Sequence, residues 1–159
     1  MGAPRDVTYS VDTSVLLNAW WRNYPPDLFP TLWRNIESLA DNGVMLASEE
    51  VLVELQKKDD EVHAWATARA QMFVPIDDEI QQLVGTILER YPRLIDNRPS
   101  RGGADPFVIA LAAARGYTVL TDERATGNES KPKIPDVCTG MGIAWTNLVG
   151  CIREQGWQI

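Results

Sequence analysis

Short apolar runs alternate with amphipathic helical patterns along nearly the whole chain of 159 residues. The runs at 7–11, 44–47, 72–76, 117–121 and 143–145 are typical of strands. Strands that alternate with helices favour an α/β fold with a mostly parallel central sheet, here of about four to five strands flanked by helices. We expect one domain over 1–159, because this length suits one sizeable core and is short for two.

The helices of this pattern should begin at recognisable capping residues. Asp27, Ser48 and Asp77 are each followed by apolar residues at helical spacing, and Asp105-Pro106 opens a strongly apolar helix. Other helices are expected over 12–21, around 60–70 and over 147–155. Pro75 favours an edge position for the strand at 72–76. The apolar run at 106–114 is about half of the ~20 residues that cross a bilayer, so we expect no membrane span.

An acid interrupts the first apolar run, YSVDTSVLL at 9–17. Asp12 leaves the first strand at its carboxyl end, and Asp122 leaves the strand at 117–121 in the same way. Glu54, in VLVEL, lies on the helix after the second strand, and Asp105 starts the apolar helix. Because ligands bind at the carboxyl ends of parallel strands, we expect these four carboxylates to converge there.

Four carboxylates at one place repel one another, and the like charges raise some of their pKa values. Hard divalent cations such as Mg²⁺ and Mn²⁺ prefer carboxylate oxygens and would neutralise the cluster. Thr13, Ser14 and Thr121 can hydrogen-bond the carboxylates or metal-bound waters. One or two ions held in this way would support hydrolysis of phosphodiester bonds.

Each acid also has a simpler interpretation. Asp12 and Asp105 could be helix caps, Glu54 a solvent-facing helix residue, and Asp122 a turn residue. Neighbouring acids could also replace an assigned one; these are Glu49, Glu50, Glu123 and Glu129.

The sequence resembles the PIN-domain nucleases in VDTSVLL, the Glu of VLVEL, the Asp of GGADPFVIALAAARG, and VLTDE. The resemblance covers about residues 7–150, and KPKIPDVCTGMGI is similar to the carboxyl end of a bacterial PIN-like group. It implies a PIN-like fold, with metal-binding catalytic acids at Asp12, Glu54, Asp105 and Asp122. Ser14 and Thr121 would support them.

Many PIN proteins are toxins of toxin–antitoxin pairs that cleave RNA with a divalent metal, commonly dimerise, and are silenced by a partner protein. The resemblance therefore implies a Mg²⁺- or Mn²⁺-dependent endoribonuclease, an antitoxin and a homodimer. One alternative is a catalytically silent PIN-fold RNA-binding or scaffold protein. Another is a phosphotransferase with Asp12 as nucleophile, although such enzymes usually carry a second Asp where this chain has Ser14.

The net charge of −7 argues against polyanion binding by the molecule as a whole, so contact with RNA would need a local basic patch or metal ions. Loops beside Asp105 and Asp122 supply candidate phosphate contacts, with solvated charged loops as the alternative: Arg98, Arg101, Arg124, Lys131 and Lys133. Trp20, Trp21, Trp33 and Tyr24 fit either core packing or a partner surface.

The start of the chain lacks the features of a secretory signal, so we expect a cytoplasmic protein with reduced thiols. Cys138 and Cys151 are then small buried hydrophobic residues. Together with His63, which we expect on a surface helix, they are too few for a tetrahedral zinc site.

Overall fold

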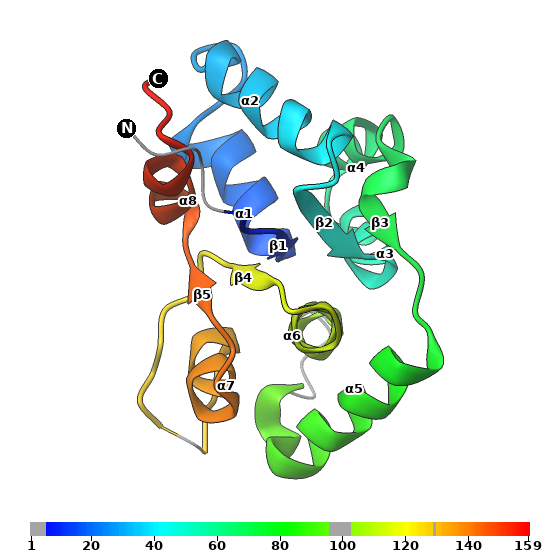
Figure 1. Ribbon diagram of the computed structural model, residues 1–159. Coiled ribbons are helices and arrows are strands. Elements are labelled where there is room, and N and C mark those ends of the chain that lie inside the picture. The colour runs from blue at the N-terminus through cyan, green and yellow to red at the C-terminus, as the bar shows by residue number, and fades with distance from the viewer. Residues whose placement is uncertain (1–5, 96–102, 129) are drawn as a thin grey trace.

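A computed structural model describes residues 6–95, 103–128 and 130–159. Its centre is a sheet of five parallel strands in the order β3-β2-β1-β4-β5. Figure 1 shows α1, α2 and α8 on one face of this sheet and α5, α6 and α7 on the other. The predicted α/β architecture is therefore confirmed.

The strands are short and lie close to the predicted runs. They are β1 Tyr9–Val11, β2 Met45–Ser48, β3 Phe73–Val74, β4 Thr118–Leu120 and β5 Trp145–Thr146. Among the described strands, β3 pairs with β2 alone and lies at the edge, as Pro75 predicts. In the centre, Val11 of β1 pairs with Leu120 of β4. These two strands therefore end side by side.

Helices follow each strand. They are α1 Thr13–Asn18, α2 Pro30–Asp41, α3 Glu49–Lys58, α4 Asp60–Thr67, α5 Asp78–Arg90, α6 Asp105–Arg115, α7 Ile134–Met141 and α8 Leu148–Gln155. Shorter helical turns lie at η1 Ala19–Asn23, η2 Ala70–Met72 and η3 Pro92–Leu94. Ser48 and Asp77 cap α3 and α5 through their side chains, as predicted.

Two predicted boundaries were wrong. Asp27 does not cap α2, which begins at Pro30 after Phe29, because proline is preorganised for the first helical turn. The last strand begins at Trp145 and not at Ile143. The backbone N–H of Ile143 donates to the carbonyl of Cys138 and closes the end of α7, where Gly142 is left-handed.

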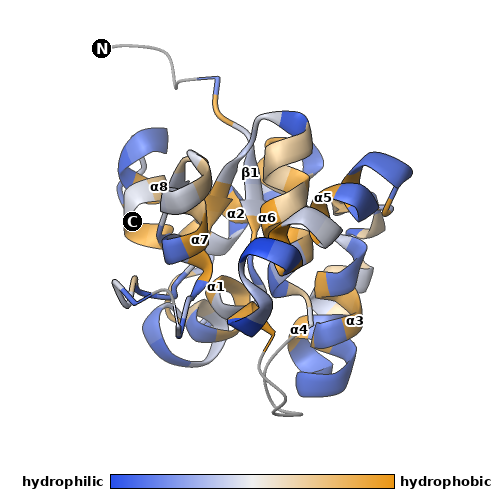
Figure 2. Ribbon diagram, turned by 90° about the horizontal axis from the view of Figure 1, so that it is seen from below, coloured by the Kyte–Doolittle hydropathy of each residue, from blue (hydrophilic) through white to orange (hydrophobic). Residues whose placement is uncertain are grey.

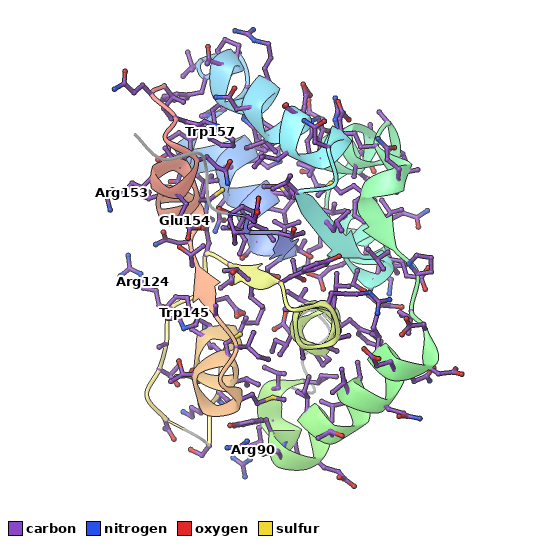
Figure 3. All side chains as sticks on the ribbon, in the orientation of Figure 1. Arg90, Arg124, Trp145, Arg153, Glu154 and Trp157 are labelled. Atoms are coloured by element: carbon purple, nitrogen blue, oxygen red, sulfur yellow. The ribbon has the colours of Figure 1, made fainter. Side chains whose placement is uncertain are left out.

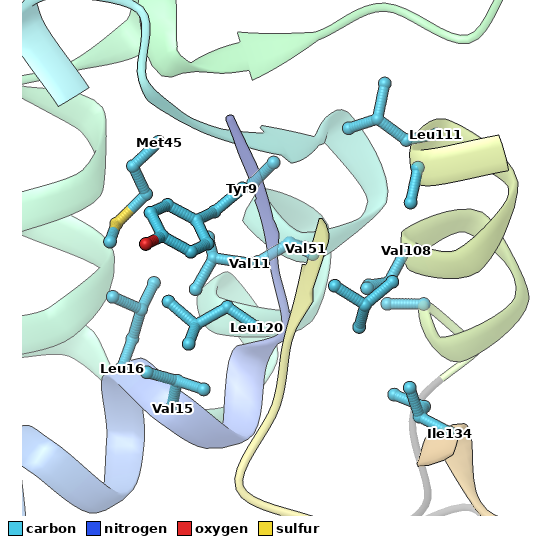
Figure 4. Close-up of a cluster of buried hydrophobic side chains, with 14 of the residues drawn as sticks. Tyr9, Val11, Val15, Leu16, Met45, Val51, Val108, Leu111, Leu120 and Ile134 are labelled. Carbon is cyan, nitrogen blue, oxygen red and sulfur yellow. The ribbon is translucent and has the colours of Figure 1, made fainter. Parts of the chain in front are cut away.

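The core is centred on α6, which packs against β1, β2, β4 and α5. Figure 2 shows α6 coloured as hydrophobic along most of its length. In Figure 4, Val108 and Leu111 of α6 lie on one side of Val11 and Leu120, and Leu16 of α1 lies on the other. This packing fixes the start of α6 next to the ends of the central strands. Within the described ranges, no helix is long and apolar enough to span a bilayer.

The remaining aromatic and sulfur groups mostly belong to the core. Trp20 packs edge-to-face on Trp33 at 5.1 Å between ring centroids, whereas Trp21 is 54% exposed. Cys138 and Cys151 are free and buried, as predicted, and burial raises the pKa values of their thiols to about 12 and about 11. His63 lies on α4, where it is half-buried.

Candidate active site

Asp12 connects β1 to α1 and is only 2% exposed. It occupies the N-cap position of α1, but its side chain makes no capping hydrogen bond. Instead its Oδ2 accepts hydrogen bonds from the hydroxyls of Ser14, at 2.6 Å, and Thr121, at 2.9 Å. The two hydroxyls fix one oxygen of a buried carboxylate, which a plain helix cap would not need.

Asp105 lies in the first turn of α6, after the N-cap residue Ala104. Burial, together with the charges of Asp12, Glu123 and Glu54, raises the pKa of its carboxyl to about 9. Lys58 acts in the opposite direction but does not offset them. The large upward shift indicates a carboxyl group that is desolvated among other acids.

Glu54 bridges α3 and the start of α6. Its Oε1 accepts from Nζ of Lys58 at 3.2 Å, and its Oε2 accepts from the backbone N–H of Ala104 at 3.4 Å. It is 9% exposed and is therefore not the solvent-facing acid of the simpler interpretation. Glu49 turns elsewhere, since its Oε1 accepts from the backbone N–H of Ile76 at 3.1 Å.

The environment of Asp12 shows the same repulsion. Burial, together with the charges of Glu123 and Glu54, raises the pKa of Asp12 to about 7. Hydrogen bonds from Ser14 and Thr121 lower the pKa but only in part. The surroundings of Asp12 and Asp105 therefore both disfavour the charged form of the carboxyl.

Asp122 and Glu123 follow β4, and their side chains have different surroundings. Asp122 Oδ2 accepts from Nδ2 of Asn18 at 3.4 Å, and burial raises its pKa although Asn18 and the backbone of Leu148 lower it. It is not among the charges that shift Asp12 or Asp105, whereas Glu123 acts on both. Asp12, Glu54, Asp105 and Glu123 are thus linked by the effects of their charges, and we call these four acids the carboxylate cluster.

Backbone contacts connect Asp122 to this cluster. Its N–H donates to Oγ of Ser14 at 3.2 Å, and the N–H of Glu123 donates to Oγ1 of Thr121 at 3.0 Å. The same two hydroxyls donate to Asp12, so they couple the loop after β4 to the end of β1. Glu129, Arg98 and Arg101 lie outside the described residues.

The cluster has the donor chemistry for a hard divalent cation. In the part of the chain that the structure describes, no three or more His, Cys, Asp or Glu side chains stand close enough to enclose an ion. Mg²⁺ commonly keeps several waters and takes only one or two protein carboxylates, so a closed cage is not required. Oγ1 of Thr13, next in sequence to Asp12, is buried without a partner among the described residues and could bond such a water.

Other side chains at the site were not predicted. Lys58 forms an ion pair with Glu54. The two residues are four positions apart, a spacing that places them on one side of a helix and could be read from the sequence. Asn18 and Arg22 approach from the end of α1 and from η1, which no local pattern indicates. Of the predicted basic residues, Arg124 lies beside the acids Asp122 and Glu123 in one pocket.

A family model described as "Domain of unknown function (DUF4411)" matches residues 9–159. None of the curated proteins matches the chain. Among solved structures, the crystal structure of VapBC2 from Rickettsia felis bound to a DNA fragment from their promoter is similar, with a TM-score of 0.54 and 20% sequence identity. The match covers 89% of this chain and 98% of that chain. The PIN-like fold that the sequence predicts is thereby confirmed.

Proposed function

Since the chain belongs to the family described as a domain of unknown function, DUF4411, we infer its activity from the site and propose a metal-dependent endoribonuclease. The observation that carries the proposal is the pair Asp12 and Asp105. Burial and neighbouring acids raise both pKa values far above that of an ordinary carboxyl. Such repulsion in a folded protein is relieved when a divalent cation binds.

Asp12 and Asp105 are the proposed metal ligands, with Glu54 and Glu123 completing the negative site. Asp122, the fourth acid of the family resemblance, would act from beside Asn18. Ser14 and Thr121 hold Asp12 in a single orientation, and Thr13 is a candidate partner for a bound water. When bound, Mg²⁺ or Mn²⁺, as one or two ions, would activate water and stabilise the leaving oxygen of a phosphodiester.

RNA is the proposed substrate, with Arg124, Lys131 and Lys133 as candidate phosphate contacts, together with Arg98 and Arg101 outside the described residues. By its resemblance to PIN toxins, we propose that the chain is the toxin of a toxin–antitoxin pair. It would act in the cytoplasm as a single domain, silenced by an antitoxin and able to form a homodimer.

Labelled RNA incubated with the protein tests this proposal. We expect cleavage with Mg²⁺ or Mn²⁺, its loss in excess chelator, and a loss by orders of magnitude in Asp12→Asn at unchanged fold. An undiminished rate in chelator would contradict the metal-dependent mechanism. Binding of RNA without cleavage in any metal would favour the catalytically silent alternative.

A further inference from the structure

A pocket of about 780 Å³ adjoins the carboxylate cluster. Its walls come from the end of α1 with η1, from the loop after β4, and from the junction of β5 and α8. Asp122 and Glu123 are part of the wall, so the pocket opens directly beside the acids. Its volume lies in the range of pockets that bind small organic groups. We call it the Trp145 pocket.

Two arginines bring positive charge to a wall that also carries the acids Asp122 and Glu123. Arg22 lines the pocket from η1, and Arg124 lines it from the loop after β4. Both side chains are exposed. Neither forms an ion pair with any residue that the structure describes. Guanidinium groups in this state are suited to bind phosphate, which they recognise through two parallel N–H donors.

Trp145 supplies an aromatic surface. Its side chain is 38% exposed, and its indole N–H donates to Oγ1 of Thr139 at 3.3 Å, which restrains the ring. Figure 3 shows Trp145 and Arg124 on the same side of the molecule, beside β5. A restrained, accessible indole next to arginines is the combination that proteins use to bind unpaired bases.

Asn147 adds a polar group to the same wall. Its Oδ1 accepts from the backbone N–H of Gly150 at 2.9 Å and caps α8. Its side-chain NH₂ group is thereby left as a donor at the pocket, and Asn23 offers a second amide. Amides of this kind can bond the edge of a base or a ribose hydroxyl.

We propose that the Trp145 pocket binds one unpaired nucleotide of a single-stranded RNA next to the phosphate that is cleaved. The base stacks on Trp145, and Arg22 and Arg124 hold the phosphates on either side. This inference rests on the proposed ribonuclease function. An unpaired strand is required, because a base inside a duplex is already stacked on both faces.

Fluorescence anisotropy with a short fluorescein-labelled single-stranded RNA tests the pocket. Measurements are made with Mg²⁺ in the Asp105→Asn background, in which the proposed function predicts little cleavage. Trp145→Ala should weaken binding about 5- to 100-fold, the range for losing one base–aromatic stack. Trp145→Phe should stay within about 3-fold, since phenylalanine also stacks. Trp21→Ala, which removes an exposed tryptophan outside the pocket, should bind like the parent.

Two further readouts separate stacking from damage to the fold. RNA should quench tryptophan fluorescence in the parent and quench it less in Trp145→Phe. Arg22→Gln should weaken binding and reduce the slope of log affinity against log salt by about 0.7. Arg34→Gln, an exposed arginine on α2, should leave both unchanged.

Equal affinity of Trp145→Ala and the parent would overturn the pocket assignment, as would an equal loss in Trp21→Ala or no measurable RNA binding. The wild-type cleavage assay distinguishes a failure of the proposed ribonuclease function from a failure of the pocket assignment. Metal-dependent cleavage by the wild type together with an unaffected Trp145→Ala means that the ribonuclease stands and the pocket does not.

Discussion

Asp105 and Asp136 occupy almost the same local position and have opposite environments. Each lies in the first turn of a helix, α6 or α7, next to a proline. Asp105 is surrounded by acids, and burial with the charges of Asp12, Glu123 and Glu54 raises its pKa to about 9. Burial also raises the pKa of Asp136, but hydrogen bonds from Lys133, Thr126 and Gly127 outweigh it, and the net pKa is lowered.

The partners of Asp136 are groups of its own loop. Oδ1 accepts from the backbone N–H groups of Thr126 and Gly127, both at 2.9 Å, and Oδ2 accepts from the N–H of Lys133 at 2.8 Å. This carboxylate stabilises the loop between β4 and α7. The partners of an acid, and not its place at a helix start, therefore set the direction of its pKa shift.

The largest expected effect is on catalysis. Asp105→Asn should lower RNA cleavage by about 100-fold or more, because even the partners of metal ligands cost roughly 10- to 100-fold. Initial rates at saturating metal measure the loss, and circular dichroism checks the fold. Asp136→Ala is the matched control and should retain far more activity. Equal losses in both variants would remove the distinction between the two aspartates.

For thermal stability we expect the reverse order, with a larger loss in Asp136→Ala than in Asp105→Asn. Asp136→Ala removes the acceptor for several exposed N–H groups, which can bond water instead, and should cost about 0.5–1.5 kcal/mol. For a chain of this size, the melting temperature falls by about 2–4 °C per kcal/mol. Asp105→Asn, measured by the same thermal melts in chelator, should be at least as stable as the wild type. A destabilised Asp105→Asn would indicate that Asp105 is a structural acid after all.

The pH dependence of stability should also differ in sign. The folded-state pKa values of Asp12, about 7, and Asp105, about 9, lie above the ordinary 3.8. Their contribution to folding is therefore complete below about pH 4 and is lost as the pH rises through 7 and 9. In chelator, the melting temperature of Asp105→Asn relative to the wild type should increase from pH 5 to pH 9. A constant difference would contradict the raised pKa.

Asp136 behaves in the opposite way. Because its pKa is lowered in the folded state, its contribution is present above the ordinary pKa and is lost as the pH falls through the lowered value. The destabilisation in Asp136→Ala should therefore shrink at acid pH. The same melts, continued below pH 4, provide this check.

The smallest effect concerns the loop that Asp136 holds. Lys131→Ala combined with Lys133→Ala should weaken RNA binding and reduce the slope of log affinity against log salt by about 1.4, at ~0.7 per phosphate contact on a single strand. Titrations at several salt concentrations measure this slope. An unchanged slope would return both lysines to the solvated-loop interpretation.

Most of the fold was predictable because it depends on local patterns. Alternating apolar runs located the strands, and Ser48 and Asp77 capped the helices that follow them. The prediction at Asp27 failed because Pro30 starts α2 without it. Side-chain caps are thus predictable only where no stronger backbone constraint lies nearby.

The convergence of Asp12, Glu54 and Asp105 followed from the rule for parallel sheets. The choice between Asp122 and Glu123 did not, because two adjacent residues after a strand point in different directions. The charge of Glu123 acts on Asp12, whereas Asp122 meets Asn18 and the backbone of Leu148, which come from other elements. The catalytic roles of all these acids remain predictions.

The most direct test of the central claim, that the carboxylate cluster binds a divalent ion, is the metal-dependent melting of wild type and Asp12→Asn. At about ten times the dissociation constant, Mg²⁺ or Mn²⁺ should stabilise the wild type by about 1.4 kcal/mol, because the ion binds the folded cluster and not the unfolded chain. This corresponds to a rise of about 3–6 °C. Asp12→Asn should be at least as stable as the wild type in chelator and should respond much less to the metal. An equal response of both proteins would show that Asp12 does not bind the ion and would contradict the account.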